Sequence, residues 1–217
     1  MSSSPENPSS LRPLVLVPTQ PECHRLRQAG IECEIVGFGP VAAAARAAAL
    51  VATFQPTQVI LMGVAGSYDE ARLAPGQAAA FDQLALWGVG AGQGADFQSA
   101  QQMGWDLWPC TDERPAVGEV LPAASGQGLL VTVCAAGGDP TQVAPILARH
   151  PGALAEDMEA FGVALACLQA GVPLHCLRGI SNRAGDRDKS HWRLREALDA
   201  VAALALESFP HLHSTPA

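Results

Sequence analysis

Residues 155–188 read AEDMEAFGVALACLQAGVPLHCLRGISNRAGDRD, and this stretch decides the fold class. Its apolar residues recur with helical spacing over Glu159–Gln169, and the run Val172–Ile180 then predicts a buried strand. That strand leads into the polar loop SNRAGDRD. Ligands of open α/β sheets bind in the loops beyond the carboxyl ends of strands, so we expect the functional site here.

Segments on both sides of this stretch continue the alternation of strand and helix. Strands are expected at Leu14–Val17, Ile31–Val36, Val59–Met62 and Leu129–Cys134. Helices are expected at Glu22–Ala29, Val41–Phe54, Thr141–His150 and His191–Phe209. This alternation predicts an α/β sandwich whose strands run in mixed directions.

The size of the chain favours one domain. It has 217 residues, of which 48% are hydrophobic and 16% charged. A chain of this length buries a substantial core but is short for two ordinary domains. We expect a single domain over residues 11–210, between a disordered N-terminal tail at 1–10 and a C-terminal tail at 211–217.

Charge and cysteine usage restrict the partners and the compartment. A net charge of −8 argues against nucleic acid, because a protein that follows a phosphate backbone needs a basic face. The six cysteines form no CxxC pair, and several lie in apolar segments, which is typical of buried reduced thiols. The start of the chain lacks a signal-peptide pattern, and no apolar run approaches the length of a membrane span. We expect a cytoplasmic protein that binds neither nucleic acid nor membrane.

Two further segments of the chain have an unusual composition. The predicted helix Val41–Phe54 is almost entirely alanine in its first half, so it can approach a sheet or a neighbouring subunit closely. From Gly88 to Gly128 the chain is rich in Gly and Pro and has little periodicity. Such an irregular stretch is unusual in a compact domain unless it shapes a binding site or an interface, and the sequence leaves both uses open.

The acids Glu156, Asp157 and Glu159 are expected to open the helix Glu159–Gln169. Acids favour the first turn of a helix for reasons of its dipole alone, so the cluster does not by itself indicate chemistry. However, EDMEA at 156–160, followed by RGISNRAG at 178–185, resembles the C-terminal signature of the purine nucleoside phosphorylase and nucleosidase superfamily. The segments VPTQPE, GFGPVAAA and LMGVAGS precede it in the order and approximate spacing of that superfamily.

Within the superfamily, the pattern is most similar to the futalosine hydrolases. The resemblance implies a nucleoside phosphorylase-like three-layer α/β/α sandwich with a mixed central sheet. It also implies a homo-oligomer that acts on a small purine nucleoside without a metal or an organic cofactor. The scattered histidines form no HxxxH or HExxH pair, which agrees with the absence of a zinc site.

The resemblance implies that Glu159 and Met158 contact the ribose and that Glu22 positions the attacking water. Cleavage of an N-ribosidic bond builds positive charge on the sugar, which a nearby carboxylate such as Glu159 stabilises. A general base such as Glu22 positions and deprotonates water. The assignment of Glu22 carries an alternative, because a lone Glu at a helix start is commonly only a first-turn acid.

Asn182 matches the position that addresses the leaving base. Adenine-specific relatives carry Asp there, whereas the NH₂ of Asn supplies two donors for the N7 and O6 acceptors of a 6-oxopurine. The resemblance therefore points to hypoxanthine or guanine as the base. The alternative is an asparagine that caps the following turn.

The loop after Asn182 allows two interpretations. Arg187 could pair with a substrate carboxylate, and Asp186 or Asp188 could orient Asn182 or donate a proton. Equally, the three residues could form an internal ion-pair cluster on the surface. The sequence does not choose between these.

Glycine-rich turns complete the expected site. Gly63 and Gly66, in GVAG, match the turn where sugar and water pack in nucleosidases, and Gly39 lets the backbone pass close to the ribose. GVAG lacks the hydroxyls and the arginine of a phosphate site, which favours hydrolysis over phosphorolysis unless Arg46 or Arg178 arrives from elsewhere. GFGPVA also fits a dinucleotide fingerprint, but it follows the second strand and no acid ends the next one.

The sequence thus predicts an enzyme that hydrolyses the N-ribosidic bond of a 6-oxopurine nucleoside. The expected substrate is futalosine, cleaved to hypoxanthine and dehypoxanthine futalosine in menaquinone biosynthesis. The alternatives are a phosphate-dependent purine nucleoside phosphorylase and a non-catalytic nucleoside-binding module of the same fold.

Overall fold

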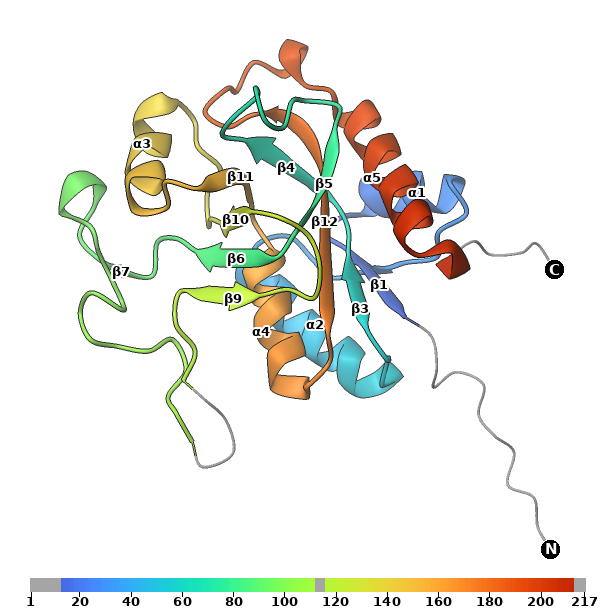
Figure 1. Cartoon of the computed structure of the whole chain (residues 1–217), viewed down its shortest axis with the longest axis horizontal. Coiled ribbons are helices and arrows are strands. Elements are labelled where there is room, and N and C mark those ends of the chain that lie inside the picture. The colour runs from blue at the N-terminus through green and yellow to red at the C-terminus, as the bar shows by residue number, and fades with distance from the viewer. Residues whose placement is uncertain (1–12, 112–115, 213–217) are drawn as a thin grey trace, which may run out of the picture.

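A computed structural model describes residues 13–111 and 116–212 of the chain (Figure 1). Its strands are β1 (Leu14–Val17), β2 (Glu34–Ile35), β3 (Val59–Leu61), β4 (Val64–Ser67), β5 (Ala78–Phe81), β6 (Gln83–Leu86), β7 (Gly90–Ala91), β8 (Gln98–Ser99), β9 (Val120–Pro122), β10 (Leu129–Thr132), β11 (Ala153–Asp157) and β12 (Leu174–Arg183). Its α-helices are α1 (Gln20–Gln28), α2 (Pro40–Phe54), α3 (Pro140–Arg149), α4 (Ala160–Ala170) and α5 (Leu194–Ser208). Short 3-10 turns are η1 (Gly94–Asp96), η2 (Lys189–His191) and η3 (Pro210–Leu212).

Most of the strands form one mixed sheet in the order β2-β1-β3-β12-β4-β11-β10-β6-β9, and β5 also pairs with β12. The strands from β2 to β4 are parallel to one another, and so are β11, β10 and β6. The two parallel blocks meet at β4 and β11, which are antiparallel. This seam between the blocks positions the site described below.

Helices cover both faces of the sheet, which confirms the predicted α/β sandwich with a mixed sheet (Figure 1). Successive residues of a strand point to opposite faces. Accordingly, Leu14 and Leu16 of β1 pack with α2 and α4, whereas Val15 and Val17 pack with α1 and α5. The alanine-rich α2 lies against α4 so closely that a Cβ on Gly162 would come within 2.3 Å of the Pro40 carbonyl oxygen.

The predicted strands and helices are present with shifted ends. Strands β4 to β9 and β11 were not predicted, and GVAG, expected as a turn, enters strand β4. The strand predicted over Ile31–Val36 is reduced to β2, and the helix predicted from His191 begins at Leu194. The assignment of Glu156 and Asp157 to the opening of a helix was wrong, because both lie on β11, all five residues of which are buried. The sheet accepts these acids because donors from distant segments reach them.

The segment from Gly88 to Gly128 forms the short strands β7, β8 and β9 at one side of the molecule (Figure 1). The predicted tails 1–10 and 211–217 lie outside the described residues, except for His211 and Leu212 in η3. Among residues 13–111 and 116–212, no helix has the length and apolar character needed to cross a membrane.

Candidate active site

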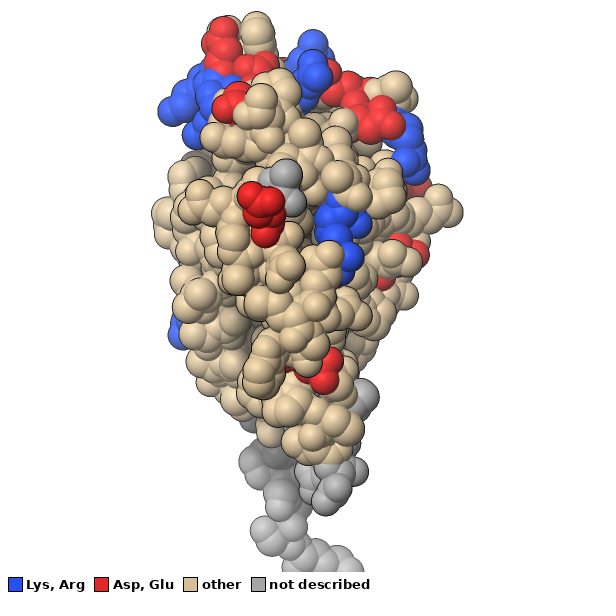
Figure 2. Space-filling model, turned by 90° about the vertical axis from the view of Figure 1, so that its left-hand side faces the viewer, with Lys and Arg blue, Asp and Glu red and all other residues tan. Residues whose placement is uncertain are grey.

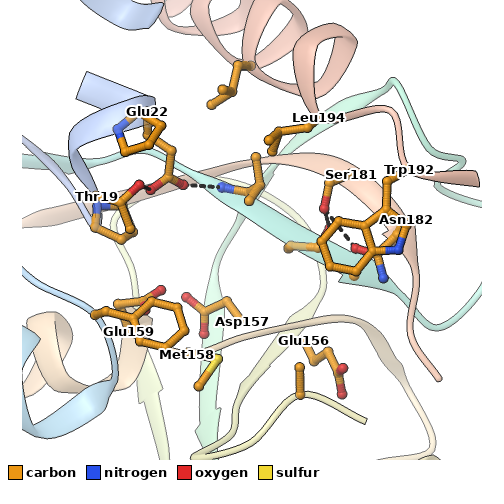
Figure 3. Close-up of a pocket in the computed structure, with 18 of the residues that line it drawn as sticks. Thr19, Glu22, Glu156, Asp157, Met158, Glu159, Ser181, Asn182, Trp192 and Leu194 are labelled. Atoms are coloured by element: carbon orange, nitrogen blue, oxygen red, sulfur yellow. Dashed lines mark hydrogen bonds between the residues drawn. The ribbon is translucent and has the colours of Figure 1, made fainter. Parts of the chain in front are cut away.

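A cavity of about 420 Å³ lies over the seam of the sheet, between β4, β11 and β12. Figure 3 shows Glu22 and Glu159 on one side of it, and Asn182, Glu156 and Trp192 on the other. We call these sides the Glu159 end and the Asn182 end. The cavity therefore brings together the three residues to which the sequence assigns catalysis.

Glu159 lies where β11 passes into α4. Its side chain is 4% exposed, and its Oε1 accepts a hydrogen bond from the backbone N–H of Gly39 at 3.0 Å. Gly39 has a φ of 86°, which side chains rarely tolerate, so glycine permits this close approach of the backbone. Burial, followed by the charge of Asp157, raises the pKa of Glu159 to about 7. Met158, the preceding residue, also lines the cavity.

Glu22 lies in the first turn of α1 and faces Glu159 across this end. Its Oε1 accepts from the N–H of Val64 at 3.1 Å, and its Oε2 accepts from the hydroxyl of Thr19 at 2.5 Å. Burial raises the pKa of Glu22 above its usual value, against the opposing effect of these donors. Gly63 lies behind this carboxylate, where an added Cβ would be 3.0 Å from Oε1. A buried carboxylate with a raised pKa is suited to accept a proton from water.

Asp157 and Arg178 form a buried ion pair beneath the cavity, with both side chains 0% exposed. The guanidinium Nη2 of Arg178 lies 2.6 Å from Asp157 Oδ2. Asp157 also accepts from the hydroxyl of Thr132 and from the N–H of Ala160, which opens α4. The pair thereby fixes the turn that carries Glu159. The sequence suggested Arg178 only as a phosphate ligand. It did not predict the ion pair with Asp157, because the two residues are 21 positions apart in the chain.

Asn182 lies at a β-bulge near the end of β12. Its Oδ1 accepts from the hydroxyl of Ser181 at 2.8 Å, and its Nδ2 donates to the carbonyl oxygen of Arg183 at 2.8 Å. Each of these bonds uses one site, so one N–H of Nδ2 is left for a ligand. Gly66, which also lines the cavity, pairs with Asn182 in the sheet.

Glu156 is a cavity-lining residue to which the sequence gave no role. It is 4% exposed on β11, and its two oxygens accept from different donors. The Tyr68 hydroxyl donates to Oε2 at 2.8 Å, and the Gly137 N–H donates to Oε1 at 2.9 Å. Burial raises the pKa of Glu156, and both hydrogen bonds act in the opposite direction. No local sequence signal identified it, because both donors lie far away along the chain.

The loop after Asn182 folds on itself. Asp186 accepts from the N–H of Asp188 and pairs with the ring of His191 at 2.7 Å, while Asp188 accepts from the N–H and the hydroxyl of Ser190. Asp188 is therefore not among the residues that line the cavity, and Ser181 rather than an acid contacts the Asn182 amide. Arg187 does line the cavity, with its guanidinium 5.4 Å from the ring centre of Trp192.

The cavity offers little to a phosphate ion. Arg178 is fully buried against Asp157, and Arg46 is exposed on α2, so neither arginine lines it. Arg187 is the sole Lys or Arg among the described residues of the lining. Within the described part of the chain, no cluster of three His, Cys, Asp or Glu residues is arranged to hold a metal.

Comparison with known proteins places these features in a family context. The family model of the Phosphorylase superfamily matches residues 26–210. Futalosine hydrolase of Streptomyces coelicolor is 37% identical and aligns with 87% of this chain and 85% of its own length. The 5'-methylthioadenosine/S-adenosylhomocysteine nucleosidase of Lysinibacillus sphaericus is 33% identical, over 69% of this chain and 66% of its own.

Solved structures share the fold at lower identity. Futalosine hydrolase of Helicobacter pylori superimposes with a TM-score of 0.72 at 16% identity, covering 94% of this chain and 99% of that one. The adenine complex of a methylthioadenosine/adenosylhomocysteine nucleosidase from Colwellia psychrerythraea gives 0.75 at 20% identity, covering 94% and 96%. These structures have the same three-layer architecture.

Proposed function

Because the chain belongs to the phosphorylase superfamily, we propose that it is a nucleosidase that hydrolyses the N-ribosidic bond of futalosine, a 6-oxopurine nucleoside, in menaquinone biosynthesis. One observation carries the proposal: two buried carboxylates, Glu22 and Glu159, face a hydrogen-bonded amide, Asn182, across one cavity. The similarity to futalosine hydrolase of Streptomyces coelicolor over most of both chains supports the choice of substrate.

In the proposed mechanism, the bond to the base loosens before water attacks. Positive charge then develops on the ribose at the Glu159 end, where the Glu159 carboxylate accepts from the vicinal hydroxyls and stabilises that charge. Met158 packs against the sugar. Gly39, Gly63 and Gly66 allow the surrounding backbone to lie close to the sugar. Glu22 takes a proton from the attacking water and directs the oxygen to the anomeric carbon, while the departing purine anion takes a proton from solvent to give the neutral base.

The leaving base occupies the Asn182 end. The N–H of Asn182 that remains after its bond to Arg183 donates to the purine as negative charge develops there. The bonds to Ser181 and Arg183 fix the orientation of the amide and leave one N–H of Nδ2 to donate. A donor suits the N7 and O6 atoms of a 6-oxopurine.

Futalosine also carries an aromatic carboxylate on its 5′ side, and Arg187 is our candidate partner for it. Arg187 is the cation of the described lining, and Trp192 beneath it offers a flat surface for an aromatic ring. Asp188, which caps its own loop, supports this segment without contacting the substrate.

Product analysis tests the proposal against phosphorolysis. The purified protein is incubated with futalosine or inosine, with and without phosphate, and the products are separated by chromatography. We expect hypoxanthine and a free sugar hydroxyl in both conditions. Formation of ribose 1-phosphate, or strict dependence on phosphate, would refute hydrolysis.

We further propose that residues 11–210 form one cytoplasmic domain that assembles as a homo-oligomer. Reduced cysteines support the compartment, since thiols persist in the cytosol. Figure 2 shows a broad face on which charged side chains are sparse. The segment between β6 and β10 also exposes Val89, Met103, Trp105, Trp108 and Val120, and exposed apolar groups of this size mark interfaces. Light scattering of the purified protein tests the assembly, and a monomeric mass would refute it.

A further inference from the structure

Glu156 is a buried carboxylate inside the cavity that the proposed mechanism does not use. The other acids of this stretch have other tasks, because Asp157 on the same strand holds Arg178 and Glu159, before α4, lies at the opposite end of the cavity. Glu156 itself lies at the Asn182 end (Figure 3). A carboxylate is costly to bury in an apolar pocket, so its place there calls for a ligand or a structural reason.

The sheet sets Glu156 and Asn182 on either side of a glycine. Glu156 of β11 and Asn182 of β12 are both register partners of Gly66 on the strand between them. Two strand spacings separate their backbones by roughly 10 Å. Gly66 also lines the cavity, and a Cβ added there would be in ordinary contact with the Ala184 backbone and with Asn182 Nδ2, each at 3.5 Å. Glycine at this position adds no side chain to the part of the cavity between Glu156 and Asn182.

The two residues offer opposite hydrogen-bonding groups. Asn182 presents a donor, the second N–H of Nδ2, because the first bonds the carbonyl oxygen of Arg183. Tyr68 and Gly137 each donate to a different oxygen of Glu156, so both oxygens act as acceptors in this arrangement. Each carboxylate oxygen has a second lone pair, so Glu156 can accept a further bond from a ligand.

A 6-oxopurine matches this donor and acceptor pair. Its O6 and N7 accept, and the adjacent N1–H donates. In a 6-aminopurine the pattern is reversed, because the exocyclic amine donates and N1 accepts. With the Asn182 donor at N7 and O6, the Glu156 carboxylate meets N1–H of hypoxanthine but the lone pair of N1 in adenine.

We propose that Glu156 is a specificity-determining residue that accepts a hydrogen bond from N1–H of the purine and so excludes 6-aminopurines. The inference rests on the proposed function for the placement of the base at the Asn182 end. It assigns the discrimination to two residues of different strands, of which Asn182 supplies the donor and Glu156 the acceptor.

Binding of the free bases tests this inference separately from catalysis. The dissociation constants of hypoxanthine, adenine and 1-methylhypoxanthine, which lacks N1–H, are measured by calorimetry for the whole chain and for Glu156→Gln. The wild type is expected to prefer hypoxanthine over both other bases. Because Gln both accepts and donates, the preference over adenine should fall by about 10- to 100-fold in the variant.

Glu119→Gln is the matched control. Glu119 is also a buried glutamate with two donors, the Gln101 N–H and Arg149, but it does not line the cavity. Its replacement should leave the preference unchanged. Tyr68→Phe is a second variant that keeps the Glu156 carboxylate but removes one donor, and it should reduce the preference by about 3-fold.

Two results would overturn the inference: a wild type that binds adenine as tightly as hypoxanthine, and a Glu156→Gln protein that keeps the wild-type preference. Another result would show that the inference holds while the proposed function fails. If the wild type binds hypoxanthine selectively through Glu156 but cleaves no nucleoside, the recognition role stands and the hydrolase assignment fails.

Discussion

The two ends of the cavity hold their polar groups in different ways. At the Glu159 end, burial raises the pKa of both Glu22 and Glu159, and Gly39 donates one backbone N–H to Glu159. At the Asn182 end, neighbouring groups direct both the amide and the Glu156 carboxylate. Burial raises the pKa of Glu156 as well, so the ends differ in what their groups face. Two carboxylates oppose each other at the Glu159 end, where positive charge develops, whereas an amide donor and a carboxylate acceptor lie at the Asn182 end. Reactivity and recognition thus depend on different physical properties.

The largest effect is expected from Glu22→Gln. The amide keeps the shape of the side chain but cannot take a proton from water, so kcat should fall by about 1000-fold. Steady-state assays with futalosine measure this loss. Glu32→Gln is the control, because it removes a largely exposed carboxylate that pairs with Arg27. A Glu22→Gln protein as active as the wild type would remove the general base from the mechanism.

Glu159→Gln should lower kcat by about 100-fold and change KM much less. The carboxylate stabilises charge that is present in the transition state but not in bound substrate. Measuring kcat and KM separately distinguishes this from a loss of binding. Equal losses in turnover and in affinity would contradict the role at the ribose.

Asn182→Asp tests the other end, with an expected loss of about 30-fold on futalosine at pH 7. The carbonyl of Arg183 lies 2.8 Å from Nδ2, so an ionised oxygen in its place would be repelled. The aspartate would have to be protonated to donate, so the loss relative to the wild type, measured at the same pH, should shrink as the pH falls. A relative loss that grows as the pH falls would contradict this description of the Asn182 end.

The pH profile of the wild type should separate the two ends further. Glu159, with a pKa of about 7, loses its charge when it is protonated. Below that value kcat/KM should fall by about 10-fold per pH unit. In Glu159→Gln only the limb due to Glu22, whose pKa burial also raises, should remain, whereas the Glu156→Gln profile should match the wild type. An unchanged limb in Glu159→Gln would assign the titration to another group.

The smallest expected effect is on stability. A carboxyl group whose pKa is raised in the folded state binds protons more tightly there, so its contribution to stability is lost as the pH rises from about 4.5 to about 7. Replacing Glu159 by Gln should therefore raise Tm at pH 8 by roughly 3 °C and leave it unchanged at pH 4. Calorimetric melting curves at the two pH values measure this difference, and a lower Tm at pH 8 would contradict it.

The sequence predicted the α/β alternation. It also predicted that Glu22, Glu159 and Asn182 belong to one site, because each of them lies in a short motif. It did not predict β11, since three apolar residues followed by two acids at 153–157 resemble a helix start unless the partners of the acids are known. Those partners, Tyr68, Thr132 and Arg178, come from other strands or their ends. The roles of Glu156 and of the ion pair under Glu159 depend on such contacts and were not accessible from local patterns.

The antiparallel seam between β4 and β11 has a consequence for how such a protein diversifies. Glu159 follows β11, whereas Asn182 lies on β12, so the residue at the ribose and the residue that donates to the base are carried by different strands. A mutation of Asn182 need not displace Glu159. A lineage that carries this sheet can therefore exchange one purine for another while it inherits the cleavage chemistry unchanged.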